Sequence, residues 1–218
     1  MLRLLEKRLK LGALYVITDP SAQKGRTHLE VLSLALEGGA DVVQLRDKSA
    51  SNEGLIAVGK QLKPLCKKYG ALLIVNDRFD VAEAIGADGV HIGQSDLPVS
   101  VAKTLLGGKR FLGISTHSLD QALEAEEGGA DYIGVGPIFQ TPTKPDYPPV
   151  GPQLIEEVYK RIRIPFVAIG GIDPSTLDTV LDAGAKSVAV VRAVVAQEDI
   201  RGAAKQLKRR VLERRKLR

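Results

Sequence analysis

Two aspartates, Asp77 and Asp96, have the side-chain chemistry to hold a divalent cation. Mg²⁺ prefers hard oxygen ligands and usually keeps coordination positions for water or substrate phosphates. Each Asp also precedes helix-forming sequence, where a short acidic side chain commonly caps the first turn. The pair therefore indicates either a Mg²⁺ site or two helix N-caps.

Several cations accompany these carboxylates. In an extended segment over residues 44–48, side chains alternate, so Gln44, Arg46 and Lys48 share one side. Lys144 lies in a long loop further along the chain. Lys and Arg bind phosphate oxygens through charge-assisted hydrogen bonds. A metal ion together with several cations matches a diphosphate.

Gly170 and Gly171 indicate a second anion site. A glycine turn followed by a helix start can bind phosphate through main-chain N–H groups. The alternative is a simple tight turn. Two separate anion sites would imply two phosphorylated substrates.

The three histidines, His28, His91 and His117, are not spaced as a metal cluster. We expect His91 to be a packed or orienting residue. His117 could transfer a proton or could head a helix. The chain contains neither a G-x-S-x-G nucleophile motif nor a paired His and Cys, so covalent catalysis by such groups is not indicated.

An internal repeat predicts the elements that position these residues. Its copies are Gly-Gly-Ala-Asp at 38–41 and 128–131, Gly-Ala-Asp at 86–88 and Gly-Ala-Lys at 184–186. In each copy a helical pattern ends at the Gly and an apolar strand follows. Further apolar strands are predicted at 13–18, 71–76, 110–115 and 165–170. Asp41, Asp88 and Asp131 fall at strand starts and are interpreted as structural.

Eight apolar strands, each followed by a helical stretch, predict an α/β fold with a parallel sheet. We expect a single-domain (β/α)₈ TIM barrel over residues 1–218, with an extra N-terminal helix near residues 2–10. The alternative is an open doubly wound sheet, but that fold usually has a Gly-rich turn after its first strand, where this chain has Thr-Asp-Pro at 18–20. In a barrel, function is expected at the carboxyl ends of the strands.

Composition limits the class of protein. The 218 residues are 44% hydrophobic and 26% charged, which is ordinary for a folded globular chain. A single cysteine, Cys66, excludes a disulfide framework. The first residues lack the apolar region of a signal peptide, and no run is long and apolar enough to cross a membrane. We expect a cytoplasmic protein without a membrane partner.

The net charge of +5 lies in one terminal segment. Residues 205–218 hold eight Lys or Arg and one acid, and the remainder has 23 basic and 25 acidic residues. Leu207, Val211 and Leu212 recur at helical spacing, so we predict a final surface helix with a solvated basic face and no nucleic-acid partner. An RNA-binding or membrane-binding arm is the alternative.

These motifs together resemble the thiamine-phosphate synthase (thiamin phosphate pyrophosphorylase) family over nearly the whole chain. The most specific segments are QLRDK at 44–48, NDR at 76–78, HIGQSD at 91–96, GVGPIF-x-TPTKPDYPPVG at 134–151 and AIGGI at 168–172. The resemblance implies a transferase that joins 4-amino-2-methyl-5-hydroxymethylpyrimidine diphosphate to a thiazole phosphate in its carboxylated form. The implied products are thiamine phosphate and diphosphate, and Mg²⁺ is the implied cofactor.

The resemblance also implies the site residues. Its pyrimidine-diphosphate site falls on Gln44, Arg46, Lys48, Asn76, Ser115 and Lys144, and we expect Arg46, Lys48 and Lys144 to be catalytic. Its thiazole-phosphate site falls on Thr141, Thr143, Gly171, Val191 and Arg192, and its Mg²⁺ ligands on Asp77 and Asp96. Arg192 stands where the family usually has Ser, and Gln140 where Pro is frequent.

The implied mechanism is a dissociative substitution, in which the aminopyrimidine expels diphosphate and the thiazole nitrogen captures the cation. Such a step needs stabilisation of the leaving group and positioning more than a general base. One alternative is a thiazole tautomerase of the same fold, which would depend on a His such as His117. Another is a non-catalytic phosphate-ligand sensor or RNA-binding module, which would need only one anion site or the basic tail.

Overall fold

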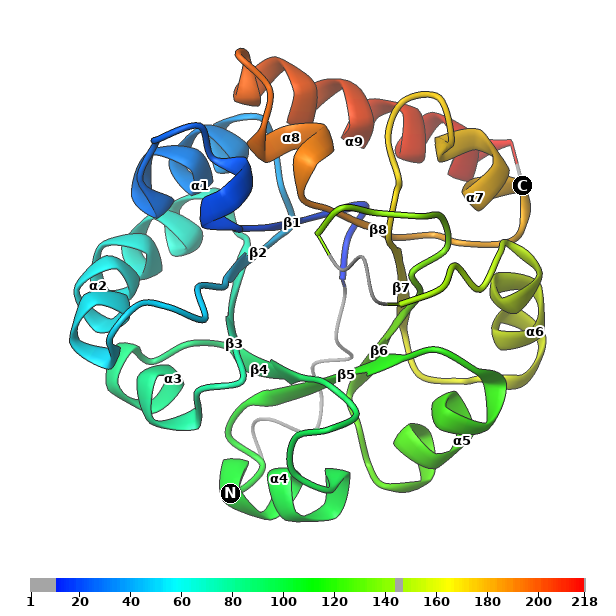
Figure 1. Cartoon of the computed structure of the whole chain (residues 1–218), viewed down its shortest axis with the longest axis horizontal. Helices are drawn as coiled ribbons and strands as arrows, with labels where there is room; N and C mark the ends of the chain where they lie inside the picture. Colours follow the sequence, from blue (N-terminus) through cyan, green and yellow to red (C-terminus); the bar gives the residue numbers. More distant parts are fainter. Residues whose placement is uncertain (1–10, 144–146, 218) are drawn as a thin grey trace.

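A computed structural model describes residues 11–143 and 147–217 of the chain. The predicted N-terminal helix near residues 2–10 and the predicted catalytic Lys144 lie outside the described residues. The described residues form a closed barrel of parallel strands surrounded by helices (Figure 1).

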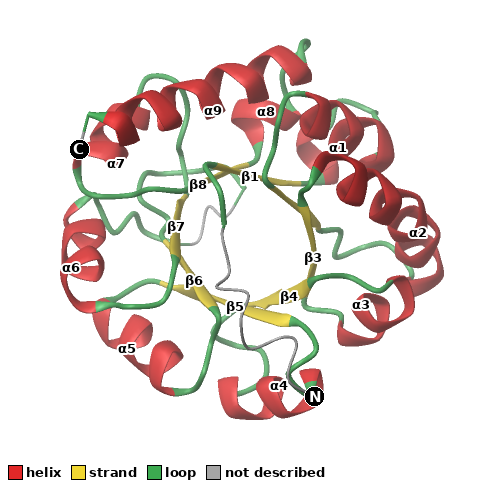
Figure 2. Cartoon of the chain, turned by 180° about the vertical axis from the view of Figure 1, so that it is seen from behind, coloured by secondary structure: helices red, strands yellow, loops and turns green. Residues whose placement is uncertain are grey.

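Eight short strands line the barrel. They are β1 (Leu14–Ile17), β2 (Val42–Leu45), β3 (Leu72–Asn76), β4 (Gly89–Ile92), β5 (Phe111–Thr116), β6 (Tyr132–Val135), β7 (Phe166–Ile169) and β8 (Val188–Val190). Each strand pairs with the next in parallel, and β8 pairs with β1, so the ring closes (Figure 2). All eight predicted strands are confirmed, and the open doubly wound sheet is excluded.

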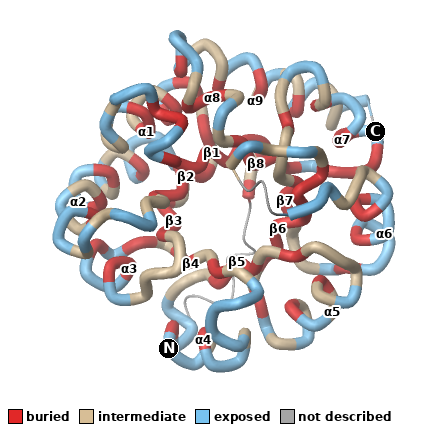
Figure 3. The backbone as a smooth tube through the Cα atoms, in the orientation of Figure 1, coloured by how far each residue is buried: buried red, intermediate tan, exposed pale blue. Residues whose placement is uncertain are grey.

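The helices lie outside the ring. They are the 3₁₀ helix η1 (Pro20–Ala22), α1 (His28–Glu37), α2 (Asn52–Tyr69), α3 (Phe79–Ile85), α4 (Val99–Leu106), α5 (Leu119–Glu127), α6 (Gln153–Arg161), α7 (Leu177–Asp182), α8 (Arg192–Val195) and α9 (Ile200–Lys216). Their inner faces and the strands are buried, while their outer faces are exposed (Figure 3). The continuous apolar strand sequences follow from burial on both faces.

The repeated Gly-Ala-Asp motif forms the start of every second strand. A glycine ends the preceding helix, as at Gly38, Gly86 and Gly128. The Asp that follows accepts a main-chain N–H from the start of the preceding strand. It also forms an ion pair with a helix lysine. The pairs are Asp41 with Lys208 (2.8 Å), Asp88 with Lys63 (2.7 Å) and Asp131 with Lys103 (2.5 Å). The structural interpretation of these three aspartates is confirmed.

The basic C-terminal segment continues a longer helix. α9 begins at Ile200, ahead of the predicted boundary at 205, because the Asp199 side chain accepts the Gly202 N–H and caps the helix. Ala204, Leu207 and Val211 are buried against the barrel. The helix therefore packs through Leu207 and Val211 as its spacing predicts, whereas Leu212, the third residue of the predicted set, is exposed.

Four cations of α9 pair with acids elsewhere in the barrel. The ion pairs are Lys208 with Asp41, Arg210 with Asp178, Arg214 with Asp182 and the longer Arg201–Glu37 contact at 3.8 Å. Arg215 donates to main-chain carbonyls of Gly12 and Lys186. These contacts and the buried apolar residues agree with the predicted surface helix. No helix of the described residues has the length and hydrophobicity needed to cross a bilayer.

Candidate functional site

Two adjoining cavities open at the carboxyl ends of the strands. The larger cavity has a volume of about 390 Å³ and the smaller about 210 Å³. The predicted residues in the larger cavity include Gln44, Thr141, Gly171, Val191 and Arg192. Those in the smaller cavity alone are Lys48, Asp77 and Asp96, and those in both are Arg46, Asn76, Ser115 and Thr143. Every predicted site residue within the described part of the chain thus lines one or both cavities.

Asp77 follows β3 in a left-handed backbone conformation, with φ of 60°. Asp tolerates this region better than most residues with a Cβ, and such strained positions are concentrated at functional sites. Its N–H donates to the His91 carbonyl over 2.9 Å, which holds the turn against β4. Helix α3 has its N-cap at Arg78 and no side-chain cap bond. The capping alternative for Asp77 is therefore wrong.

Asp96 is held by a tight turn after β4. Its carboxylate accepts the Gly93 N–H over 2.7 Å, so the side chain is directed back to the strand end. Helix α4 has its N-cap at Pro98 and no side-chain cap bond. Capping of α4 by Asp96 is also wrong, because two further residues separate it from the helix.

The side chains of Asp77 and Asp96 contact each other. Burial raises the pKa of Asp77, and the nearby negative charge of Asp96 raises it further, whereas Lys48 and Arg46 oppose the shift. Two carboxylates in one site repel each other unless a proton or a cation compensates. This repulsion is the electrostatic feature expected of a divalent-cation site whose ligands are Asp77 and Asp96.

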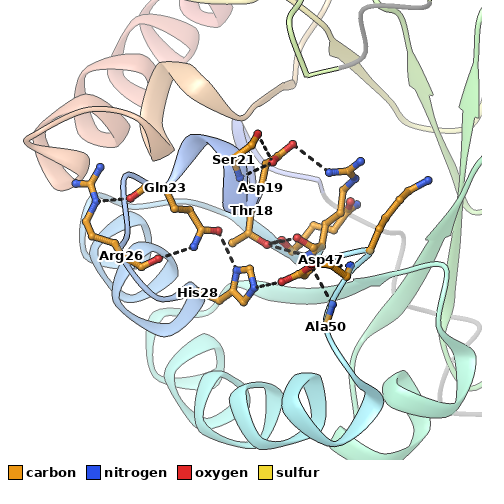
Figure 4. Close-up of polar contacts among 12 residues, drawn as sticks. Thr18, Asp19, Ser21, Gln23, Arg26, His28, Asp47 and Ala50 are labelled. Atoms are coloured by element: carbon orange, nitrogen blue, oxygen red, sulfur yellow. Dashed lines mark hydrogen bonds and ion pairs between the residues drawn. The ribbon is translucent and has the colours of Figure 1, made fainter.

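Arg46 is fixed by Thr18 and Asp19 of the loop that follows β1, two residues labelled in Figure 4. Its guanidinium lies 3.2 Å from the Asp19 carboxylate, and both side chains are mostly buried. Its main-chain N–H donates to the Thr18 hydroxyl over 2.8 Å. These contacts hold Arg46 in a position where it lines both cavities. The Asp19 carboxylate compensates part of its positive charge.

The rest of the 44–48 segment is also held in place. The Asp47 carboxylate accepts N–H groups from Ser49 and Ala50 and lies 3.1 Å from His28 Nε2 (Figure 4). Despite the opposing effect of burial, these hydrogen bonds lower the pKa of Asp47 to about 2. The other nitrogen of His28 contacts the Gln23 side chain. His28 thus has a loop-supporting role on the first helix.

Lys48 and Arg192 are the exposed cations of the cavities. Neither forms an ion pair within 4.0 Å with an acid of the described residues. Lys48 lies beside Asp77 and Asp96, whereas Arg192 begins α8 at the larger cavity. The charge of each is available to an anionic ligand.

The glycine pair after β7 allows the loop after β6 to pass very close. Gly170 and Gly171 have φ of 98° and 63°, and a Cβ on Gly171 would lie 2.6 Å from the Phe139 Cβ. Phe139 N donates to the Gly170 carbonyl over 3.0 Å, which docks the loop on the turn. Thr141 and Thr143 follow in that loop, at the same cavity. The turn is therefore both tight and part of the cavity wall.

The two remaining histidines face the cavities. His117 contacts the Gly136 carbonyl through Nδ1, and its ring lies 4.8 Å from that of Tyr147. Ser118, not His117, caps α5. His91 has contacts through both ring nitrogens, to Tyr132 and Ser115. The expectation of an orienting role for His91 agrees with these contacts.

Three polar residues here were not predicted from the sequence: Asp19, Tyr15 and Tyr132. Asp19 directly follows β1, so the same strand-end argument used for the other strands would have found it. Tyr15 and Tyr132 lie within otherwise aliphatic strands, and their hydroxyls contact each other inside the barrel. A hydroxyl in a fully buried strand requires a partner, and that signal was available in the sequence.

Comparison with known proteins agrees with this arrangement. The family model described as thiamine monophosphate synthase matches residues 14–194. A thiamine-phosphate synthase of Chloroflexus aurantiacus is 50% identical over 196 residues, covering 89% of this chain and 90% of that protein. One of Shouchella clausii is 47% identical over 200 residues, covering 91% and 96%.

A solved structure gives the same result for the fold. The thiamine phosphate pyrophosphorylase of Pyrococcus furiosus superposes with a TM-score of 0.87 at 40% identity, covering 93% of this chain and 96% of that one. Residues 14–194, which the family model matches, include all eight strands and every lining residue of both cavities except Gln197. The chain belongs to the thiamine monophosphate synthase family.

Proposed function

We propose that this protein is a thiamine-phosphate synthase, a transferase that joins 4-amino-2-methyl-5-hydroxymethylpyrimidine diphosphate to the thiazole phosphate in its carboxylated form. The observation that carries the proposal is the contact between the Asp77 and Asp96 side chains in the smaller cavity, which Lys48 and Arg46 also line. The larger cavity adjoins it. One cavity suits a diphosphate with its metal and the other a second anion. The family to which the chain belongs supports this assignment.

Asp77 and Asp96 would hold Mg²⁺, and the residues present fit that ion. The raised pKa of Asp77 reflects a repulsion that a divalent cation would relieve. No three His, Cys, Asp or Glu side chains gather as a metal site within residues 11–143 and 147–217, so substrate oxygens and water would complete the shell. Bound there, Mg²⁺ would supply Lewis-acid stabilisation of the diphosphate charge.

The protein's own cations would stabilise the leaving diphosphate. Lys48 lies in the smaller cavity, and Arg46 reaches both cavities from its ion pair with Asp19. As the bond between the pyrimidine methylene and the diphosphate oxygen breaks, negative charge grows on that oxygen. Cations that bind the departing group more strongly than the substrate lower the barrier. Lys144 would join them.

Gln44, Asn76 and Ser115 would orient the pyrimidine, and the larger cavity would hold the thiazole phosphate. Thr141, Thr143 and the Gly171 turn lie together there, with main-chain groups of Val191 and Arg192. The thiazole nitrogen then captures the pyrimidine cation, and the carboxylate of the thiazole leaves as CO₂, which gives thiamine phosphate. No general base is required, and the cavities accordingly hold cations, amides and hydroxyls.

Two alternatives find less support. A thiazole tautomerase would depend on His117, but Nδ1 of that ring contacts the Gly136 carbonyl, and the ring lies tilted beside that of Tyr147. An RNA-binding module would depend on α9, four of whose cations pair with acids elsewhere in the barrel. We also propose that the reaction takes place in the cytoplasm, because phosphate charges prevent passive passage of both substrates through a membrane.

The test is to mix both phosphorylated precursors with Mg²⁺ and to measure thiamine phosphate and diphosphate. Both products are expected, and their absence with folded protein would reject the function. A Thr143→Val substitution tests the assignment of the cavities, because it removes one hydroxyl at nearly constant shape. We expect weaker thiazole-phosphate binding, by about 1–3 kcal/mol. Because Thr143 lines both cavities, weaker pyrimidine-diphosphate binding instead would assign its hydroxyl to the diphosphate.

A further inference from the structure

A chain of hydrogen bonds crosses the interior of the barrel and joins two residues of the cavity wall. Gln44 Nε2 donates to the Tyr15 hydroxyl over 2.6 Å. The Tyr15 and Tyr132 hydroxyl oxygens lie 3.1 Å apart. Tyr132 contacts His91 Nδ1 over 3.1 Å, and His91 Nε2 contacts the Ser115 hydroxyl over 3.0 Å. We call these five residues the interior relay.

The two tyrosines at its centre are sealed from solvent. Tyr15 is 1% exposed and Tyr132 is 0% exposed. Burial raises the pKa of both phenols, so each keeps its proton at neutral pH. Each hydroxyl therefore has one proton to donate.

The barrel leaves a dedicated space for the relay. Gly113 of β5 lies between His91 of β4 and Tyr132 of β6 in the strand register. A Cβ on Gly113 would lie 2.4 Å from the Tyr132 hydroxyl oxygen and 2.5 Å from His91 Nδ1. Any other residue at this position would displace the contact, so the backbone itself accommodates it.

The relay has a direction, because each hydroxyl donates only once. Tyr15 accepts from the Gln44 amide, and we assign the Tyr15 proton to Tyr132 and the Tyr132 proton to His91 Nδ1, because this arrangement gives both buried hydroxyl protons an acceptor within the relay. A neutral imidazole that accepts at Nδ1 carries its proton at Nε2. That proton is donated to the Ser115 hydroxyl.

The direction of these hydrogen bonds determines which hydrogen-bonding groups Gln44 and Ser115, the two ends of the relay, present to a ligand. With its amide nitrogen used on Tyr15, Gln44 retains its carbonyl oxygen as an acceptor. Ser115 accepts from His91 and so retains its own proton as a donor. Both residues line the larger cavity. An acceptor on one wall and a donor on another match a ring with an amino group and an unprotonated ring nitrogen.

We propose that Tyr15, Tyr132 and His91 are positioning residues that fix this polarity and thereby select an aminopyrimidine over its oxo counterpart. The inference rests on the proposed function for the identity of the ligand. An oxo ring with a protonated nitrogen presents the opposite pattern, so both ends of the relay would face unmatched groups. Sites built around such hydrogen bonds reject mismatched analogues by large factors, on the order of 10⁴ in favourable cases.

The polarity can be measured without substrate. In protein labelled with ¹⁵N at its imidazoles, two-bond ¹H–¹⁵N spectra report which nitrogen carries the proton, and a His91→Gln variant assigns the His91 signals. The parent protein is expected to show His91 protonated at Nε2 alone at neutral pH. Tyr132→Phe should abolish this fixed preference. A proton on Nδ1, or on both nitrogens, in the parent protein would overturn the inference.

The selectivity is measured by calorimetry with two ligands, 4-amino-2-methyl-5-hydroxymethylpyrimidine diphosphate and its 4-oxo counterpart. We expect the parent protein to prefer the amino ligand by at least about 10²-fold. Tyr132→Phe and Tyr15→Phe keep the ring packing and should reduce this ratio about tenfold or more. The control is Tyr159→Phe on α6, a half-exposed tyrosine that should leave the ratio unchanged.

The outcomes separate this inference from the proposed function. If the parent protein binds the aminopyrimidine but Tyr132→Phe and Tyr15→Phe discriminate as well as the parent, the relay does not set selectivity and the inference fails alone. If the parent protein binds neither pyrimidine, the proposed function and the recognition step fail together. A loss of discrimination with unchanged melting temperature supports the relay, because a merely structural role would lower stability without changing the ratio.

Discussion

The aspartates at the two ends of the barrel have opposite surroundings. At the amino ends of the strands, Asp88 accepts the Leu73 N–H and pairs with Lys63, and Asp41 and Asp131 have the same arrangement. At the carboxyl ends, Asp77 faces Asp96, and the pKa of Asp77 is raised by burial and by that second carboxylate. The first arrangement satisfies each charge within the chain, whereas the second leaves negative charge to be satisfied by a ligand.

The lysines and arginines differ in the same way. Four of those on α9 pair with acids elsewhere in the barrel, whereas Lys48 and Arg192 have no ion-pair partner within 4.0 Å among the described acids. Charges that are satisfied internally contribute to stability, and charges left unsatisfied at a concave site are available for binding. The difference identifies the functional end of the barrel independently of any sequence motif.

The largest expected effect is on catalysis at the carboxyl end. Asp77→Asn removes one carboxylate of the candidate Mg²⁺ pair, and Asn still tolerates the left-handed backbone at this position. We expect turnover to fall on the order of 10²–10³-fold, as when one group that stabilises transition-state charge is removed. Steady-state kinetics at saturating Mg²⁺ measure this, and activity within a few-fold of the parent would remove Asp77 from the metal site.

At the amino ends of the strands we expect a loss of stability without a loss of activity. Asp88→Asn loses the ion pair with Lys63 and weakens the bond from the Leu73 N–H. Stability should fall by about 1–3 kcal/mol, measured by urea unfolding, with kcat unchanged. A large loss of kcat at unchanged stability would break the comparison between the two ends.

A third test is whether Asp77→Asn raises or lowers the stability of the metal-free protein, and at which pH. Because the folded state raises the pKa of Asp77, it binds that proton more tightly than the unfolded state does. As the pH rises above 3.8, the pKa of Asp77 in the unfolded chain, ionisation of Asp77 progressively destabilises the metal-free protein. This loss of stability is complete once the pH exceeds the raised pKa of Asp77 in the folded protein. In metal-free thermal unfolding, Asp77→Asn should be more stable than the parent above that window, and a lower melting temperature would contradict the repulsion.

The smallest effect is expected on the solvated side of α9. Arg209 and Glu213 are 3.6 Å apart, and both side chains are more than half exposed. Arg209→Ala should change stability by at most about 0.5 kcal/mol and leave activity unchanged. A drop in activity in a salt-dependent assay would instead assign α9 a part in ligand binding.

The sequence predicted the barrel because its signals are local and periodic. The eight apolar strands and the glycines that end helices, such as Gly38 and Gly86, follow from backbone preferences within a few residues. It also predicted which polar residues stand at the mouth, since parallel strands present their carboxyl ends together. What local sequence left open was the role of Asp77 and Asp96, since each precedes helix-forming sequence that favours a cap, and only the cations elsewhere in the chain pointed to a metal site.

Tertiary structure decided the questions that depend on groups far apart in the chain. The turn at Gly93 directs Asp96 to Asp77, the ion pair of Asp19 with Arg46 joins two loops, and Lys208 of α9 reaches Asp41. Hydrogen bonds and charge interactions act over a few ångströms in space, whatever the separation in sequence. The sequence by itself therefore determined the strands, their order and the set of residues at the mouth. Only the folded barrel determined which charges are satisfied within the protein and which remain for a ligand.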